Sequence, residues 1–290
     1  MAAVVRPFTW SVRRELWENR SIALAPLLVA ATMLIGFAIA AVHLPERRRA
    51  ALLLDEARQH AAVERPYDIA AAIVLITSFL VGAWYCLEAL HGERRDRSVL
   101  FWKSLPVSDL TAVLSKASIP LLVLPPVATA VIVATQLLMV LMSTAVLLGS
   151  GLSFATIAPQ LRFVPSPLIA LYAAAVAALW HAPVYGWLLL VSAWARRAAF
   201  LWAVLPFYAA AALERLAFGT THLSSFLRDR LLGWSTEGLS IHAPPSLAVI
   251  TVAQLTPGRL LASPGLWGGL AFGAVCLAAA VKLRRSRGTI

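Results

Sequence analysis

Charged residues are scarce in this sequence, which limits the classes of protein that it can encode. Only 13% of the 290 residues are Asp, Glu, Lys or Arg, 60% are hydrophobic, and the mean hydropathy is +0.78. A soluble domain usually carries about 25% charged residues. The apolar residues are also gathered into runs of about 20 residues or more, the length that crosses a bilayer. The composition therefore predicts an all-α, polytopic integral membrane protein.

Cysteines and metal-binding motifs are equally sparse. The two cysteines, Cys86 and Cys276, lie inside apolar runs, and no CxxC motif, HExxH motif or dense carboxylate cluster occurs. This excludes a disulfide framework and zinc-ligand spacing. We expect no metal site, and we expect both cysteines to behave as small buried hydrophobic residues.

A motif for nucleotide binding is also absent. The pattern GxxxxGK[ST] does not occur, so the chain is not expected to hold ATP in a P-loop. The net charge of +11 does not indicate nucleic-acid binding, because the basic residues flank the apolar runs instead of forming one patch. We therefore expect neither ATP nor nucleic acid to bind this chain.

The sequence does contain six long apolar runs, which predict the following membrane spans: 21–42, 69–90, 119–148, 168–194, 199–213 and 264–281. Pro125 and Pro126 should break or kink the third run, because proline lacks an N–H and crowds the preceding turn. The region 214–263 holds an amphipathic stretch at 223–232 and an apolar stretch at 246–255 that is too short to span. We expect re-entrant or interfacial elements there.

The N-terminal segment 2–20 is amphipathic rather than continuously apolar. Trp10 and Trp17 lie at the border of a helical face formed by four apolar residues: Val5, Phe8, Val12 and Leu16. This pattern is typical of a helix that lies in the membrane interface.

The distribution of Lys and Arg predicts the orientation of the chain. Six spans place both termini on one side, together with the segments 91–118 and 195–198. These four segments hold fifteen Lys and Arg residues, and the segments on the opposite side hold ten. The run Arg47–Arg49 is on that opposite side and is the main exception to the rule. The positive-inside rule therefore predicts that both termini are cytoplasmic.

The segment 91–118, HGERRDRSVLFWKSLPVSDLTAVLSKAS, is a charged interval between the second and third apolar runs. Leu105-Pro106 should end its first element, and Ser108 is placed to cap a helix that begins near Asp109. Phe101 and Trp102 are suited either to burial among lipid headgroups or to insertion into a groove of a partner protein.

The sequence of this segment, GERRDRSVLFWKSLPVSD, resembles the first cytoplasmic loop of one branch of the ABC-2 type export permeases. YGWLLLVSAWARR at 185–197 is similar to the end of the fourth span in that branch. The last span, with Leu266-Trp267 and Arg284-Arg285, is similar as well, so the resemblance covers essentially the full length.

The resemblance implies an interfacial elbow helix at 1–20 and a six-span transmembrane domain at 21–290. It implies the permease subunit of an ABC exporter, which is itself not an enzyme, in the bacterial cytoplasmic (inner) membrane. The permease would form a dimer, with itself or with a paralogue, and would bind two copies of a separate ATPase that holds ATP and Mg. The loop would form a cytoplasmic coupling helix that contacts the ATPase through these residues: Glu93, Arg94, Arg95, Asp96, Arg97, Phe101, Trp102, Lys103, Ser104, Leu105 and Pro106.

Polar residues at membrane depth are candidates for the translocation path: Gln136, His181 and Tyr208. A structural role for His181, as donor to a backbone carbonyl that Pro183 leaves free, is the alternative. Ser153 and His181 also allow an intramembrane serine protease, and a membrane scaffold protein without transport is the third class. The sequence leaves peptides, lipids, polysaccharides and ions open as substrates.

Overall fold

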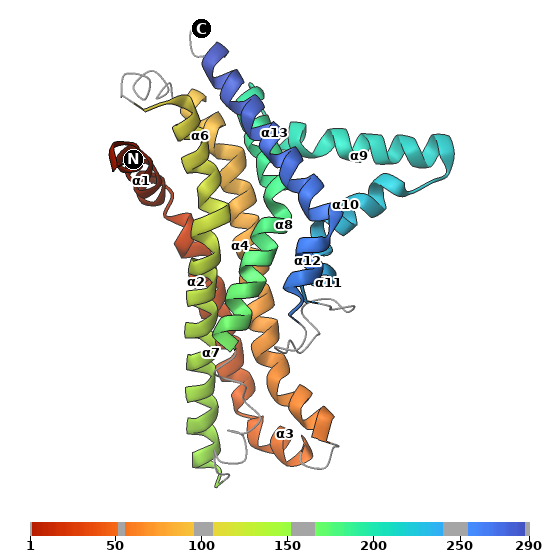
Figure 1. Cartoon of the computed structure of the whole chain (residues 1–290). Helices are drawn as coiled ribbons and strands as arrows, with labels where there is room; N and C mark the ends of the chain where they lie inside the picture. The colour runs from red at the N-terminus through yellow and green to blue at the C-terminus, as the bar shows by residue number, and fades with distance from the viewer. Residues whose placement is uncertain (1, 52–55, 96–106, 152–165, 240–254, 288–290) are drawn as a thin grey trace.

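The computed structural model describes residues 2–51, 56–95, 107–151, 166–239 and 255–287, and every regular element in these ranges is helical (Figure 1). The elements are α1 (Ala2–Glu18), α2 (Ser21–Ala41), α3 (Leu44–Ala51), α4 (Glu56–Arg95), α6 (Asp109–Ser118), the π-helical turn η1 (Ile119–Val123), α7 (Leu124–Gly149), α8 (Ser166–Trp194), α9 (Ala199–Phe218), α10 (His222–Leu232), α11 (Trp234–Leu239), α12 (Pro257–Ala262) and α13 (Pro264–Arg287).

Within the described ranges, six helical segments are long and apolar enough to cross a membrane: Ser21–Ala41, Val63–Arg95, Asp109–Gly149, Pro167–Trp194, Ala199–Phe218 and Pro264–Ser286. The prediction of an all-α, multi-pass membrane protein is confirmed at this level. The predicted stretch at 246–255 lies outside the described residues except for Leu255.

The helix α4 begins well before the predicted span at residue 69. Its early turns are amphipathic, and they pack against α7, where Val63 and Leu147 are buried together. The Tyr67 hydroxyl lies 3.2 Å from Oγ of Ser143 on α7. These contacts extend the helix beyond the apolar run. Hydropathy alone does not reveal this extension.

The helix α9 continues past the predicted end at residue 213. Gly219 ends it in the left-handed conformation (φ 66°), and its N–H donates to the carbonyl of Arg215. The Glu214 carboxylate folds around this turn and accepts hydrogen bonds from the backbone N–H groups of His222 and Leu223. Glu214 and Arg215 therefore lie within α9 and do not interrupt it, and the Glu214 carboxylate binds the first backbone N–H groups of α10. The amphipathic stretch predicted at 223–232 forms α10.

The predicted interruption at Pro125-Pro126 takes the form of the π-helical turn η1. The N–H of Leu124 donates to the carbonyl of Ile119 instead of the carbonyl one residue closer. Prolines cannot donate, so a wider turn is a common way to accommodate them within one long helix. As a result α6, η1 and α7 are continuous from Asp109 to Gly149.

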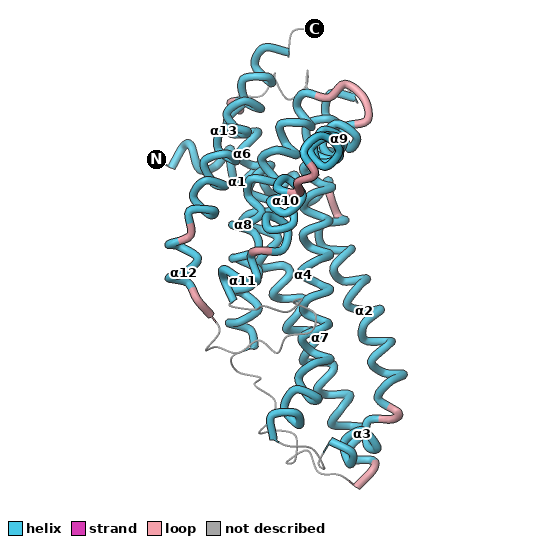
Figure 2. Tube along the Cα trace, turned by 90° about the vertical axis from the view of Figure 1, so that its right-hand side faces the viewer, coloured by secondary structure: helices cyan, strands magenta, loops and turns pink. Residues whose placement is uncertain are grey.

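Five apolar segments, in α2, α4, α7, α8 and α13, run roughly along one long axis, whereas α9 projects sideways (Figure 1). Figure 2 views α9 along its own axis. The chain turns at Ala198, which has a positive φ of 49°. In α8, 61% of the most apolar window is buried, against 11% in α9, so α8 is central and α9 is peripheral.

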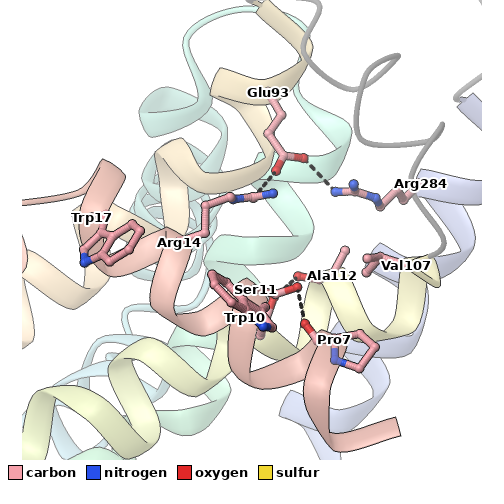
Figure 3. Close-up of a pocket in the computed structure, with 10 residues that line it drawn as sticks. Pro7, Trp10, Ser11, Arg14, Trp17, Glu93, Val107, Ala112 and Arg284 are labelled. Carbon is pink, nitrogen blue, oxygen red and sulfur yellow. Dashed lines mark hydrogen bonds and ion pairs between the residues drawn. The ribbon is translucent and has the colours of Figure 1, made fainter. Parts of the chain in front are cut away.

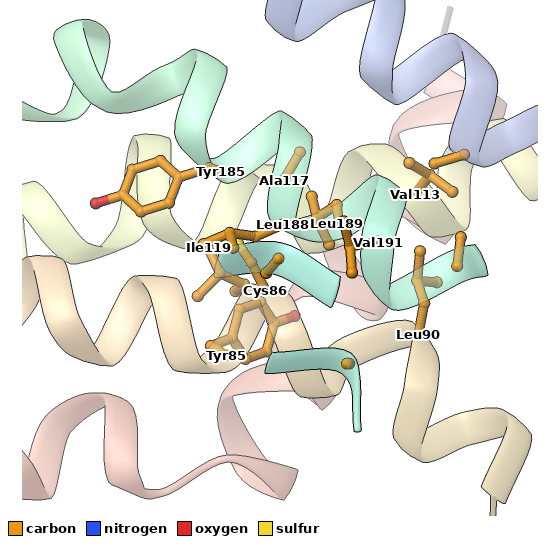
Figure 4. Close-up of a cluster of buried hydrophobic side chains, with 14 of the residues drawn as sticks. Tyr85, Cys86, Leu90, Val113, Ala117, Ile119, Tyr185, Leu188, Leu189 and Val191 are labelled. Atoms are coloured by element: carbon orange, nitrogen blue, oxygen red, sulfur yellow. The ribbon is translucent and has the colours of Figure 1, made fainter. Parts of the chain in front are cut away.

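Both described chain ends and the start of α6 lie at the same end of the bundle (Figure 1). The largest cluster of buried apolar side chains lies near this end and includes Cys86, Ile119 and Leu189 (Figure 4). Cys86 and Cys276 are both buried free thiols, as predicted. Two facing glycines, Gly186 and Gly273, allow α8 and α13 to approach closely.

Candidate functional site

Buried and half-buried charges gather where α1, α4, α6 and α13 meet, at the end of the bundle that carries the chain ends. We call the following six residues the ionic cluster: Arg14, Glu15, Glu93, Asp109, Lys116 and Arg284. Three are acidic and three are basic, so their formal charges cancel. Charges removed from water are stable only when they are paired and hydrogen-bonded.

The local structure of each helix places these charges. On α1, Val12 and Leu16 pack against the bundle core, so the predicted apolar face contacts protein. Glu15 lies between them in sequence and is also turned inward, with 2% of its surface exposed. On α6, the Ser108 side chain accepts from the N–H of Thr111, which confirms the predicted cap.

Glu93 is the centre of the cluster. Its Oε1 lies 3.0 Å from Nζ of Lys116. The same oxygen lies 3.5 Å from Nη2 of Arg14, and Oε2 accepts a 2.7 Å hydrogen bond from Nη1 of Arg284 (Figure 3). One carboxylate at the end of α4 therefore holds cations from three other helices. Hydrogen bonds of this kind between ionised groups are stronger than neutral ones.

Glu15 forms the second pairing centre. Its Oε1 accepts from Lys116 at 2.8 Å and from Arg14 at 2.7 Å, and Oε2 accepts from the Tyr85 hydroxyl at 2.7 Å. Burial raises the pKa of the Glu15 carboxyl, but its pairing with Lys116, Tyr85 and Arg14 lowers it by more. The net pKa is below the ordinary value of 4.5, and the residue is a carboxylate at neutral pH.

The cluster holds both ends of the segment that was predicted to contact a partner. Glu93 lies three residues before the undescribed stretch 96–106, and Asp109 lies three residues after it. Arg284 on α13 binds both, through Nη1 to Glu93 and through Nε to Asp109 at 3.0 Å. The two ends of the segment are thus joined to the same guanidinium group.

Of the predicted coupling residues, three are described. Glu93 is in the ionic cluster, Arg94 donates to the backbone carbonyls of Ser192 and Ala195 at the end of α8, and Arg95 pairs with Glu88 at 3.1 Å. The remaining predicted coupling residues lie outside the described part of the chain: Asp96, Arg97, Phe101, Trp102, Lys103, Ser104, Leu105 and Pro106.

The three predicted path residues lie on three different helices and differ in exposure. Gln136 is buried on α7, whereas Tyr208 on α9 is 74% exposed. His181 is buried on α8, with its ring 4.4 Å from the ring of Phe79. Their role in a path stays a prediction.

His181 joins α8 to α10. Its Nδ1 lies 2.6 Å from the carbonyl oxygen of Ala177, and its Nε2 lies 3.1 Å from that of Leu231. The carbonyl contacted on α8 is that of Ala177, one turn before His181. It is not the carbonyl that Pro183 leaves free, so Pro183 is not the reason for this contact. Both ring nitrogens face carbonyl oxygens, which disfavours a role for His181 as the base of a serine nucleophile. Ser153 lies outside the described residues.

Sequence analysis missed Glu15 and Lys116 as site residues. They are 101 positions apart, so no local pattern connects them. The one available signal was a single lysine on the turn immediately before a long apolar run.

Among the described residues, no group of three or more His, Cys, Asp or Glu side chains is arranged to hold a metal ion. Comparisons with protein-family models, with curated proteins and with solved structures gave no match to this chain. The geometry of the ionic cluster and the sequence of the adjoining segment therefore carry the functional argument.

Proposed function

We propose that this chain is the membrane-spanning permease subunit of an ATP-driven ABC exporter. A separate ATPase subunit binds ATP and Mg, and the segment 96–106 contacts that subunit from the cytoplasmic side. Two permease copies and two ATPase copies form the complete exporter in the bacterial inner membrane. The proposal draws on the sequence of the segment 91–118, on the six apolar helices and on the missing P-loop motif.

The observation that carries the proposal is the shared attachment of both ends of the segment. Glu93 on α4 and Asp109 on α6 are held by Arg284 of α13, and Glu93 also contacts Arg14 of α1. A displacement of the segment by a partner would therefore move four helices together, since charge-assisted hydrogen bonds join them. This is the mechanical property that a coupling element requires.

Binding of the ATPase is tested with the double substitution Phe101→Ala and Trp102→Ala. Aromatic residues at the centre of an interface typically contribute about 2 kcal/mol or more each, so we expect co-purification of the ATPase subunit to be lost. The matched control is Trp84→Ala with Phe200→Ala, since both of these aromatic side chains are exposed on spanning helices. Full retention of ATPase binding and transport by the first variant would show that the coupling role is wrong.

Coupling is tested separately with Arg284→Gln. We expect the complex with the ATPase to assemble and hydrolyse ATP, while transport per ATP hydrolysed falls. Arg285→Gln is the control, because Arg285 is exposed on the same helix and takes no part in the ionic cluster. Equal transport per ATP in the two variants, at equal unfolding temperature, would contradict the role of the cluster.

A further inference from the structure

A pocket of about 310 Å³ opens beside the ionic cluster, between α1, α6 and α13 (Figure 3). Arg14, Glu93 and Arg284 line its charged part. Its remaining lining is apolar or weakly polar: Pro7, Trp10, Ser11, Trp17, Val107, Ala112 and Ser115. A volume of this size is at the lower end of the range for small-molecule sites.

The position of α1 leads us to expect this pocket at the level of the membrane surface. The helix α1 ends at Glu18, and α2, the first apolar segment, begins at Ser21, so α1 is joined almost directly to a spanning helix. Trp10 and Trp17 line the pocket, yet they are 63% and 62% exposed. Tryptophan is enriched where lipid headgroups meet hydrocarbon. We therefore expect lipid headgroups beside this pocket.

The electrostatics of the pocket favour an anion. The charges of the ionic cluster cancel. Glu18 pairs with Arg14 at 3.5 Å but does not line the pocket, and Arg13 adds a positive charge beside the two tryptophans. Its guanidinium carbon lies 5.8 Å from the ring centroid of Trp10 and 4.7 Å from that of Trp17. Within the described residues Arg13 pairs with no carboxylate, so its charge is available to a ligand.

Arg284 adds a donor inside the pocket. Its contacts with Asp109 and Glu93 use Nε and Nη1, which leaves the two N–H groups of Nη2 for a ligand. Guanidinium groups match the geometry of phosphate oxygens. A zwitterionic headgroup has less to gain, because Glu93, the only carboxylate among the described residues that line the pocket, already holds three cations.

We propose that this pocket binds the headgroup of an acidic glycerophospholipid. The phosphate is attracted by Arg13 at the mouth and by Arg284 within the pocket, and the glycerol region lies against Trp10 and Trp17. The proposal goes beyond the exporter assignment and does not depend on it. It requires only that α1 lies at the surface of a membrane.

The test uses the full-length protein, freed of lipid in detergent, and counts bound phospholipids by native mass spectrometry. We expect one molecule of dioleoyl phosphatidylglycerol to bind in preference to dioleoyl phosphatidylcholine. Arg13→Gln should weaken phosphatidylglycerol binding about fivefold, since one basic residue near a membrane surface contributes that much. Adding Trp17→Ala should weaken it further. Both side chains are exposed, so neither change should alter the unfolding temperature.

The matched control is Arg259→Gln with Trp267→Ala, an exposed arginine and tryptophan on α12 and α13 outside this pocket. It should bind phosphatidylglycerol like the unchanged protein. Equal affinity for the two lipids, or equal weakening by the control, would overturn the proposal. Glycerol 3-phosphate distinguishes lipid from free phosphate: displacement of the lipid by this soluble compound would show that phosphate alone is recognised, and would overturn the assignment to lipid.

Discussion

The ammonium group of Lys116 lies 2.8 Å from Oε1 of Glu15, and the two side chains are only 3% and 2% exposed. This pair connects the N-terminal helix to the helix that follows the predicted coupling segment. Removing one partner of a buried pair leaves a desolvated charge, which typically costs about 3 to 5 kcal/mol.

Lys116→Met leaves Glu15 with Arg14 as its remaining cation, so we predict that it lowers the free energy of unfolding by about 3 kcal/mol, the lower end of that range. The double variant Lys116→Met with Glu15→Leu should recover part of the loss, because no unpaired charge remains on either side. The measurement is a double-mutant cycle of thermal unfolding in detergent. Additive effects of the two substitutions would show that the pair is not coupled.

The pH dependence of stability should report on Glu15. Its pKa is lower in the folded protein than the ordinary value of 4.5, so its contribution is complete above that pH and is lost as the pH falls below it. Burial raises the pKa of Glu18, which acts in the opposite direction. We expect Glu15→Gln to flatten the decrease of the unfolding temperature below pH 4.5. An unchanged acid limb in this variant would assign that decrease to other groups.

The close approach of α8 and α13 gives a third prediction. A Cβ atom on Gly186 would lie 2.9 Å from the carbonyl oxygen of Gly273, so the helices must separate to accept it. We expect Gly186→Ala to destabilise by about 1 to 3 kcal/mol, as overpacking does. Gly268→Ala on α13 is the control, since a Cβ there would have no described neighbour within 4 Å and should be neutral or slightly stabilising. The measurement is the unfolding temperature of both variants.

Arg94 and Arg95 are adjacent in sequence but should differ in effect. Arg94 donates to two carbonyls at the end of α8, one of them that of Ala195 at 2.8 Å. Arg95 makes an exposed pair with Glu88. Loss of hydrogen bonds from a charged donor costs about 1.5 to 3 kcal/mol, whereas an exposed pair contributes about 0 to 1. Arg94→Ala should therefore lower the unfolding temperature clearly more than Arg95→Ala, and the reverse order would contradict this reading of the contacts.

The spans could be predicted from the sequence because a bilayer demands long apolar helices. The apolar runs identify all six candidate segments. Helix ends were harder to place, since they depend on other contacts. The start of α4 depends on packing between Val63 and Leu147, and the end of α9 depends on the conformation of Gly219. The sideways direction of α9 follows a turn at Ala198, a residue without a sequence signal for positive φ.

The candidate site was only half predictable. The segment around Glu93 was conspicuous as charge between apolar runs. Its partners Arg14 and Arg284 come from opposite parts of the chain, with separations of 79 and 191 positions from Glu93. Pairings over such distances follow from the tertiary arrangement, which hydropathy and charge counting do not specify.

The position of Arg284 after the sixth span also sets an order of events during synthesis. Arg14 and Glu15 leave the ribosome before any spanning helix, and Lys116 follows two spans later, whereas Arg284 arrives only after all the others. Until α13 is inserted, Asp109 has no guanidinium partner from that helix, and Glu93 lacks one of its three cations. Completion of the charge balance therefore marks the completion of insertion, and a chain that stops before α13 keeps two cations against three carboxylates among the residues of the ionic cluster.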